Sequence, residues 1–198
     1  DMWGYNRYTK QTVNIGSAFL QNEWKNEKWS ILLGGRLDKH NLINHVIFSP
    51  RANLRFNPSE DINLRLSYSS GFRAPQAFDE DLHIENVGGT VSMIERAKTL
   101  KEEKSQSFSA SADMYHRFGA FQVNFLVEGF YTRLSDVFVL ENIGERDGIL
   151  IKERRNGSGA KVLGLSMEGK MAYLSLFQLQ AGVTLQQSRY DEPEKWSE

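Results

Sequence analysis

Apolar and polar side chains alternate residue by residue in eight separate stretches of this chain. In an extended chain neighbouring side chains point to opposite faces, so each stretch predicts a β-strand with one apolar face and one polar face. The apolar positions that carry the alternation are Val13, Ile15 and Phe19; Trp29, Ile31, Leu33 and Leu37; Phe48, Ala52, Leu54 and Phe56; Ile62, Leu64, Leu66 and Tyr68; Phe108, Ala110, Ala112 and Met114; Phe121, Val123, Phe125, Val127 and Tyr131; Leu163, Leu165, Met167 and Met171; and Phe177, Leu179, Ala181, Val183 and Leu185.

The links between these stretches alternate between short and long. Tight turns are expected at Asn26, 57–60, Gly119 and Leu174, and long links at 40–46, 71–104 and 135–158. Strands of an outer-membrane barrel are joined by short periplasmic turns and longer extracellular loops. The pattern therefore predicts an all-β fold, an antiparallel up-and-down transmembrane β-barrel segment of about eight strands. We also expect a short helical turn near 76–82, within the second long link.

The chemistry of the apolar face favours lipid as its environment. No Asp, Glu, Lys or Arg lies along the middle of that face in the well-patterned strands, where a Lys or Arg would cost roughly 2–4 kcal/mol. Aromatic residues gather beside the tight turns, as they do at a membrane interface: Trp24, Trp29, Phe56, Phe118, Phe121, Tyr173 and Phe177.

Composition excludes other classes. With 25% charged residues and a mean hydropathy of -0.49, the chain contains no apolar run of the roughly 20 residues that a spanning helix needs. A net charge of -1 argues against a nucleic-acid partner. The sequence contains no cysteine and no H-E-x-x-H, phosphate-loop or nucleophile-elbow motif, so we expect no enzyme activity and no cofactor.

Two alternatives remain open from the pattern alone. Eight strands could close as a small autonomous outer-membrane barrel, structural or enzymatic, if the first strand pairs with the last. A soluble lipocalin-like binding barrel would place the apolar face inward instead.

Five ordered motifs carry a family resemblance. The segment Ser67-Tyr68-Ser69-Ser70-Gly71-Phe72-Arg73-Ala74-Pro75 resembles the S-Y-x-x-G-F-R-A-P string of TonB-dependent outer-membrane receptors. The other four are similar to the G-x-R-x-D, S-P-R, L-x-P-E-x-S and G-x-E-x-E-G elements of that family, and they lie at 34–38, 49–51, 100–105 and 164–169. Glu102 stands where the family usually has Pro, and Ser166 where it often has Glu. The string after Pro75 is most similar to receptors of the Bacteroidetes type.

The resemblance implies a bacterial outer-membrane barrel of about 22 strands, filled by an N-terminal plug domain, that imports a scarce nutrient with energy from TonB. Residues 1–198 would then form a partial barrel domain, about a third of the wall, without the plug. The implied partners are outer-membrane lipid, the plug, TonB and a nutrient such as a ferric siderophore, haem or cobalamin. The glycan class of nutrient also remains open.

Candidate site residues follow from parity and from the motif. Arg51, Arg55, Arg65 and Glu128 lie on the polar parity, where a charge is hydrated or faces the plug. Gly71, Phe72, Arg73, Ala74 and Pro75 are expected to end their strand, because Pro75 removes a ladder donor, and Arg73 is a candidate ligand or plug contact. His83 lies in the interval where haem-importing relatives carry an axial histidine, and no other histidine is spaced to form a metal site with it.

Overall fold

The computed structural model describes residues 2–4, 7–76, 85–87 and 90–192, whose regular secondary structure is β-strand. The strands are β1 (Met2–Gly4), β2 (Arg7–Thr9), β3 (Ile15–Lys25), β4 (Trp29–His40), β5 (Val46–Ser59), β6 (Ile62–Arg73), β7 (Glu85–Val87), β8 (Thr90–Arg96), β9 (Glu103–Phe118), β10 (Phe121–Ser135), β11 (Phe138–Arg146), β12 (Ile149–Asn156), β13 (Ala160–Tyr173) and β14 (Phe177–Tyr190). Among these residues no helix has the length and apolar character to cross a membrane.

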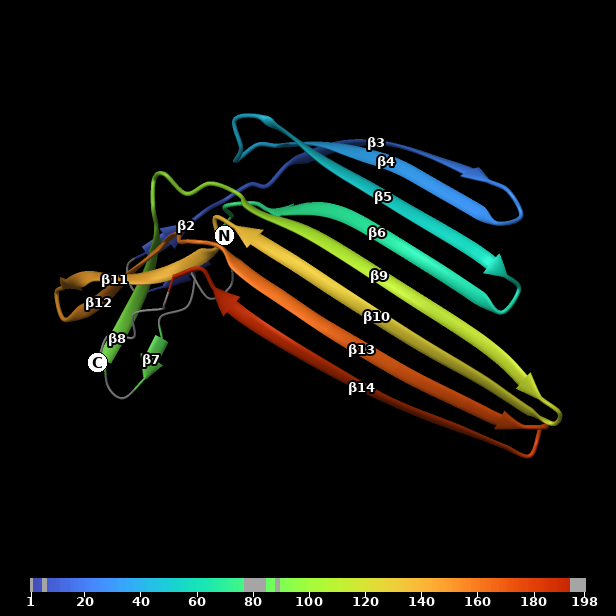
Figure 1. Cartoon of the computed structure of the whole chain (residues 1–198). Helices are drawn as coiled ribbons and strands as arrows, with labels where there is room; N and C mark the ends of the chain where they lie inside the picture. Colours follow the sequence, from blue (N-terminus) through green and yellow to red (C-terminus); the bar gives the residue numbers. More distant parts are fainter. Residues whose placement is uncertain (1, 5–6, 77–84, 88–89, 193–198) are drawn as a thin grey trace.

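The eight long strands form one antiparallel sheet in the order β14-β13-β10-β9-β6-β5-β4-β3. Figure 1 shows this sheet as a curved wall, with β3 and β14 at its two edges. Its strands contain 11 to 16 residues, and a tilted strand of about 9–11 residues is long enough to cross a bilayer. The predicted up-and-down order of eight strands is confirmed.

All four predicted tight turns lie at the same end of the sheet (Figure 1). In the first turn the side-chain oxygen of Asn26 accepts hydrogen bonds from the backbone N–H groups of Lys28 and Trp29, at 3.0 and 2.7 Å. This side-chain capping of backbone donors is what favours Asn in turns. Gly119 takes a φ of 58° in the third turn, which glycine adopts at little cost. The turns are therefore encoded locally, which is why the sequence reveals them.

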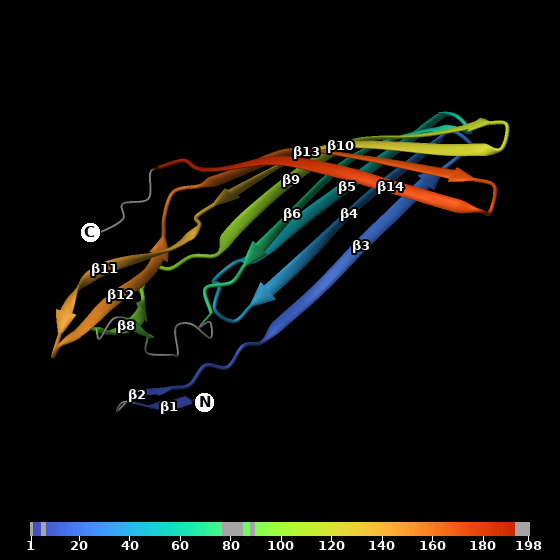
Figure 2. The same ribbon diagram turned by 90° about the horizontal axis from the view of Figure 1, so that it is seen from below.

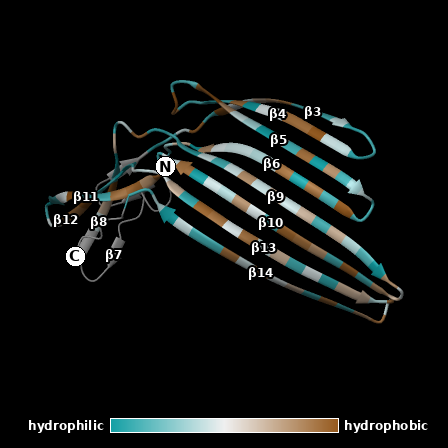
Figure 3. Cartoon of the chain, in the orientation of Figure 1, coloured by the Kyte–Doolittle hydropathy of each residue, from teal (hydrophilic) through white to brown (hydrophobic). Residues whose placement is uncertain are grey.

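The pairing register separates an apolar face from a polar face. Side chains of directly paired residues lie on the same face of a sheet. One row of paired residues is wholly apolar: Leu66, Ala110, Gly129, Leu165 and Leu185. The neighbouring row on the other face is polar: Arg65, Ser111, Glu128, Ser166 and Thr184. Figure 3 shows the resulting alternation of hydrophobic and hydrophilic positions along the strands. The predicted parity is confirmed for β4, β5, β6, β9, β10, β13 and β14.

The parity predicted for the first strand is wrong. Ile15 pairs with His40 and Phe19 pairs with Arg36, so both lie on the polar face, whereas Leu20 pairs with Gly35 on the apolar face. The strand occupies a sheet edge, where Phe19 is 82% and Leu20 is 81% exposed. Because apolar side chains point to both faces of β3, the alternation of this strand alone does not identify its apolar face.

Aromatic rings cluster at the turn end of the apolar face. The ring centroids of Trp29 and Phe56 are 4.1 Å apart and stacked, and those of Phe121 and Tyr173 are 4.7 Å apart. Phe177 stacks on Tyr173 at 5.8 Å. Each contact joins neighbouring strands, so the expected aromatic residues form two clusters at this end of the sheet, one on β4 and β5 and one on β10, β13 and β14.

Two of the long links contain additional strands that the sequence pattern did not predict. A mixed sheet in the order β11-β12-β8-β7 forms at the end opposite the tight turns, and β1 pairs with β2 as a short hairpin (Figure 2). In the mixed sheet, β8 and β12 pair in parallel. This pairing joins the link between β6 and β9 to the link between β10 and β13. The helical turn expected near 76–82 falls almost entirely outside the described residues.

The buried apolar residues lie toward this long-loop end rather than along the sheet. They are Ile43, Ile47, Ile94, Val137, Ile151 and Ala160. Along the middle of the sheet, large apolar side chains remain exposed; for example, Phe125 is 44% and Val183 is 50% exposed. An exposed apolar face of this extent marks a surface that contacts a membrane or another protein.

Candidate functional site

At the long-loop end, the end of β6 and the starts of β9 and β11 bring the predicted residue Arg73 together with Glu103 and Phe138. Arg73, the last residue of β6, pairs in register with Glu103, the first residue of β9. The Arg73 Nη1 atom lies 3.8 Å from Glu103 Oε2, and its guanidinium lies 5.4 Å from the ring centroid of Phe138. Glu103 Oε2 also accepts a hydrogen bond from the Phe138 N–H at 3.4 Å. Arg73 therefore connects the strand exit to the loop segment that begins β11.

The residues that follow Arg73 leave the sheet as the motif predicted. β6 ends at Arg73, and Pro75 is buried. The Pro75 carbonyl oxygen accepts a hydrogen bond from Arg96 Nη1 at 3.2 Å, which ties the strand exit to the end of β8. A side chain at Gly71 would meet the Ser105 hydroxyl at 3.1 Å, so the small residue permits close packing of β6 on β9.

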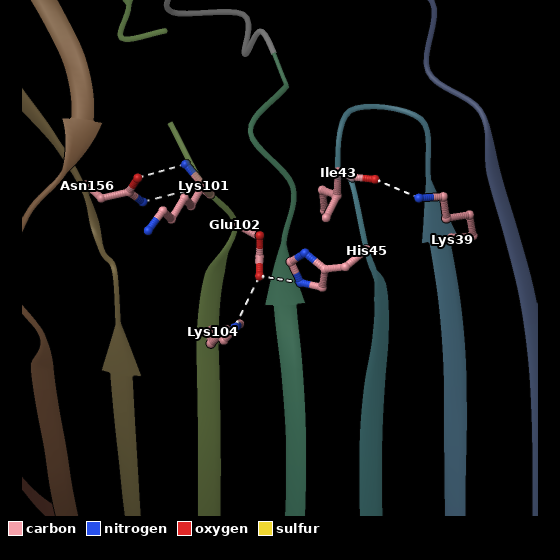
Figure 4. Close-up of polar contacts among 7 residues, drawn as sticks. All are labelled: Lys39, Ile43, His45, Lys101, Glu102, Lys104 and Asn156. Carbon is pink, nitrogen blue, oxygen red and sulfur yellow. Dashed lines mark hydrogen bonds and ion pairs between the residues drawn. The ribbon is translucent and has the colours of Figure 1, made fainter. Parts of the chain in front are cut away.

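Glu102 is a buried anion that the sequence pattern did not single out. Its Oε1 atom lies 3.1 Å from Lys104 Nζ and 3.1 Å from His45 Nε2, and its side chain is 6% exposed (Figure 4). Burial alone would raise the pKa of Glu102. A hydrogen bond to its own backbone N–H, the hydrogen bond from Lys104 and the nearby charges of Lys104 and His45 outweigh burial and lower the pKa of Glu102 below its ordinary value. The carboxylate therefore stays charged and links β9 to the loop before β5.

Asn156 forms a second link between segments distant in sequence. Its side-chain oxygen accepts a hydrogen bond from the Lys101 N–H at 2.8 Å, and its amide nitrogen donates to the Lys101 carbonyl at 3.1 Å (Figure 4). The amide nitrogen also donates to the Asp136 carbonyl at 2.8 Å. A similar contact closes the loop between β4 and β5, where Lys39 Nζ donates to the Ile43 carbonyl at 3.0 Å. The partners of Asn156 are 20 and 55 residues away, and no local signal in the sequence predicts these bonds.

The polar face of the sheet carries the four predicted charged residues. Three of them, Arg55, Arg65 and Glu128, belong to one row of paired residues. In that row Ser111 lies between Arg65 and Glu128. The fourth, Arg51, pairs with Ser69 two rows away. Arg65 Nε donates to Asn63 Oδ1 at 2.8 Å. The Nε atom of Arg55 is buried and has no hydrogen-bond acceptor among the described residues.

A further polar cluster on this face was missed by the sequence reasoning. Asp38 is 2% exposed, and its carboxylate accepts hydrogen bonds from Ser17 Oγ at 2.6 Å and from Arg36 Nε at 2.7 Å. Arg36 and Asp38 belong to the G-x-R-x-D motif, whose two charged residues share a strand face because they are two apart. That spacing was a usable signal for an ion pair within the strand.

His83, the candidate haem ligand, lies outside the described residues. Within the described ranges, no group of three or more His, Cys, Asp or Glu side chains is arranged to hold a metal ion. The described site is thus a charged and hydrogen-bonded rim at the long-loop end, above a polar face of hydroxyl, amide and guanidinium groups. Such a surface suits hydrated or polar contacts.

The sequence matches the family described as "TonB dependent receptor-like, beta-barrel" over residues 2–197. No curated protein sequence matches it significantly. The siderophore receptor PirA from Pseudomonas aeruginosa is similar in structure, with a TM-score of 0.75, 15% identity, and coverage of 90% of this chain and 35% of that one. The FrpB iron transporter from Neisseria meningitidis is also similar in structure, with a TM-score of 0.66 and 17% identity. The match covers 90% of this chain and 26% of that one. For the ferric enterobactin receptor PfeA the TM-score is 0.66 and the identity 18%, and the match covers 88% of this chain and 27% of that one. This chain therefore spans about a third or less of each of these solved structures.

Proposed function

The chain belongs to the TonB-dependent receptor family, in its β-barrel part, and from this premise we propose that it forms a section of the wall of an outer-membrane receptor that imports a scarce nutrient. The observation that carries the proposal is the two-faced sheet: one face exposes apolar side chains across its strands, and the other places Arg65, Ser111 and Glu128 in one polar row. A wall between lipid and an aqueous lumen requires both faces.

Family membership sets the location and the class. The chain is a bacterial outer-membrane protein, and its family is one of transport receptors rather than enzymes. For the whole protein we propose a larger barrel, of which residues 1–198 form a part, with a plug domain inside and energy supplied through TonB. The coverage of 35% or less of each solved relative's length supports this proposal.

Arg51, Arg55, Arg65 and Glu128 would face the plug from the polar side of the wall. The buried Arg55 Nε, which lacks an acceptor among the described residues, supports this assignment because a buried donor costs about 1–3 kcal/mol when unsatisfied. A carbonyl or carboxylate of the plug would supply the missing acceptor. Arg73 would brace the same boundary from the strand exit, where its side chain is 48% exposed.

An iron chelate is the cargo that we propose. The support is that PirA is named a siderophore receptor, FrpB an iron transporter and PfeA a ferric enterobactin receptor. The long loop at 71–104, with His83 and Arg73, would carry the ligand contacts of this section. Haem and cobalamin are the alternative cargoes, and His83 would ligate the iron only in the case of haem.

Uptake by the intact receptor tests this function. Iron-starved cells that produce the receptor as their sole route for a given ferric siderophore should accumulate radiolabelled iron, and deletion of the tonB gene should stop accumulation while surface binding of the chelate persists. Accumulation that continues without TonB would contradict energised import. Haem or cobalamin in place of the siderophore, in the same cells, identifies the cargo.

A further inference from the structure

Three basic residues lie side by side on the apolar face, near its long-loop end. Arg133 of β10 pairs directly with Lys161 of β13, and Lys161 pairs directly with Arg189 of β14. We call Arg133, Lys161 and Arg189 the basic row. The register puts them on the same face as Tyr131 and Leu163, which lie two residues closer to the middle of the sheet. The basic row therefore begins where the apolar band of the lipid-facing side ends.

The sheet continues this polar boundary on the next strands. Arg133 pairs on its other side with Gln106, and Gln106 pairs with Ser70. Directly below, the exposed ring of Phe108 pairs with Tyr131. Aromatic side chains followed by polar and basic ones mark the level at which lipid head groups replace acyl chains. Because the long loops extend from this end, the boundary faces the outer leaflet.

Within the described ranges, Asp191 is the acidic partner that the structure shows for the basic row. Asp191 Oδ1 lies 2.7 Å from Lys161 Nζ. The hydrogen bond from Lys161 lowers the pKa of Asp191 despite desolvation, and the charges of Lys161, Arg133 and Arg189 lower it further. One carboxylate offsets one of three positive charges. Like charges directly opposite each other across strands destabilise a sheet, so a further anion would stabilise the row.

We propose that the basic row binds the phosphate groups of an anionic lipid in the outer leaflet of the outer membrane. Guanidinium groups match phosphate oxygens by paired hydrogen bonds, and an ammonium group adds a point charge. The row presents two guanidinium groups and one ammonium group on adjacent strands, at the depth of the head groups and above an apolar surface that fits acyl chains. This lipid site lies on the opposite face from the proposed transport path and does not depend on which nutrient is carried.

Lipid binding to the intact receptor in detergent tests the proposal, with native mass spectrometry as the readout of bound diphosphoryl lipid A. The triple variant Arg133→Gln, Lys161→Gln and Arg189→Gln should bind this lipid about 100-fold more weakly, since each basic residue near a charged head group contributes about fivefold and the three factors multiply. The matched control, Lys25→Gln, Lys28→Gln and Arg117→Gln, removes the same charge at the tight-turn end and should leave binding unchanged. Lipid A stripped of both phosphates should bind the unchanged receptor as weakly as diphosphoryl lipid A binds the triple variant.

A further variant tests the opposite direction. Asp191→Asn removes the competing carboxylate and should strengthen binding of diphosphoryl lipid A by about fivefold, a gain that misfolding cannot produce. If the triple variant fails to assemble, Arg189→Gln alone should still weaken binding about fivefold. Equal binding by the triple variant and the unchanged receptor would overturn the proposal. Displacement of the lipid by millimolar inorganic phosphate would also overturn it, because the site would then bind free anions rather than lipid.

Discussion

Gly164 allows two neighbouring strands to pack an aromatic ring between them. It pairs directly with Phe130, whose ring atoms occupy the space where a side chain at position 164 would begin, and the Leu185 carbonyl would lie 2.9 Å from that side chain. We expect Gly164→Ala to destabilise the folded barrel by about 1–3 kcal/mol, because the ring must shift and the backbone cannot. The measurement is the denaturant unfolding of the intact receptor in detergent.

The control for this prediction lies on the same strand. A side chain at Gly169 would meet nothing within 4 Å, so Gly169→Ala should change the unfolding free energy far less than Gly164→Ala. Combining Phe130→Ala with Gly164→Ala should recover part of the loss, since the ring contact is then removed and the contact with the Leu185 carbonyl remains. Equal effects at positions 164 and 169 would mean that the ring does not constrain the strand.

Glu102 should make the stability of the strand exits depend on pH. Its pKa is lowered in the folded state, so its contribution is fully present above the unfolded carboxyl pKa of about 4.3 and is lost as the pH falls through the lower folded value. We expect Glu102→Gln to lower the melting temperature of the receptor at pH 7 and to have progressively less effect as the pH falls through the lowered folded pKa of Glu102, because the protonated carboxyl is uncharged like the amide.

The control is Glu60→Gln, which removes a carboxylate from an exposed tight turn. It should leave the melting temperature nearly unchanged across the same pH range. A Glu102→Gln effect that stays the same across the whole acid titration would show that the contacts with His45 and Lys104 do not depend on charge.

How far single residues can be predicted depends on how local their partners are. The end of β6 at Arg73 was expected because Pro75 acts on its own backbone. The sequence pattern marks Glu102 only as a departure from a motif and gives no signal for Asn156, because the partners of both side chains come from other links in the chain. Residues that act across distant segments carry no periodic signal in the sequence.

The strands show why alternation identifies most faces and fails on one. In β10 the residues of apolar parity, such as Phe125 and Val127, lie on the apolar face that the register defines. β3 carries exposed apolar side chains on both parities, and only its pairing with β4 reveals that Phe19 lies opposite Arg36. The parallel pair of β8 and β12 was also unpredictable, because nothing within either segment encodes contact with the other.

The two faces of the sheet should tolerate charge very differently. An Arg in place of Phe125, Val183 or Leu64 would enter lipid, at a cost of about 2–4 kcal/mol near the bilayer centre. An Arg in place of Asn124, Thr184 or Asn63, each the immediate neighbour in sequence, would enter the aqueous side. We expect the first set to reduce assembly in the outer membrane strongly and the second set to reduce it little, measured as heat-resistant folded receptor in membrane fractions. Equal losses in both sets would refute the register.

At the scale of the whole molecule, the eight-stranded wall and the small outer sheet are built by different interactions. The wall is held by continuous ladders between its neighbouring strands, whereas the contacts of β8 include its pairing with β7 and β12, the Glu95 ion pair with Arg146 of β11 and the Arg96 contact with Pro75. The wall and its turns were predictable because they follow from local alternation. The candidate ligand site stays a prediction, stated as an interval of sequence: Arg73 contacts Glu103 and Phe138 from other segments of the chain, and His83 lies outside the described residues.

Deletion of residues 81–97 from the intact receptor should therefore separate assembly from uptake. The deletion removes β7 and β8 but leaves every ladder of the eight-stranded wall in place, so insertion into the outer membrane should be unchanged. Loops longer than about 12–15 residues are usually functional or disordered, and we expect this one to carry the nutrient contacts, so uptake should be abolished. Insertion is measured as heat-resistant receptor, and uptake as accumulation of labelled nutrient. Uptake that survives the deletion with unchanged affinity would mean that the nutrient binds elsewhere on the receptor.

The candidate haem ligand has a narrower test within the same loop. His83→Ala should lower haem binding, read from the Soret band, while leaving ferric siderophore or cobalamin uptake unaffected. The absence of any Soret change in the unaltered receptor would rule out haem ligation.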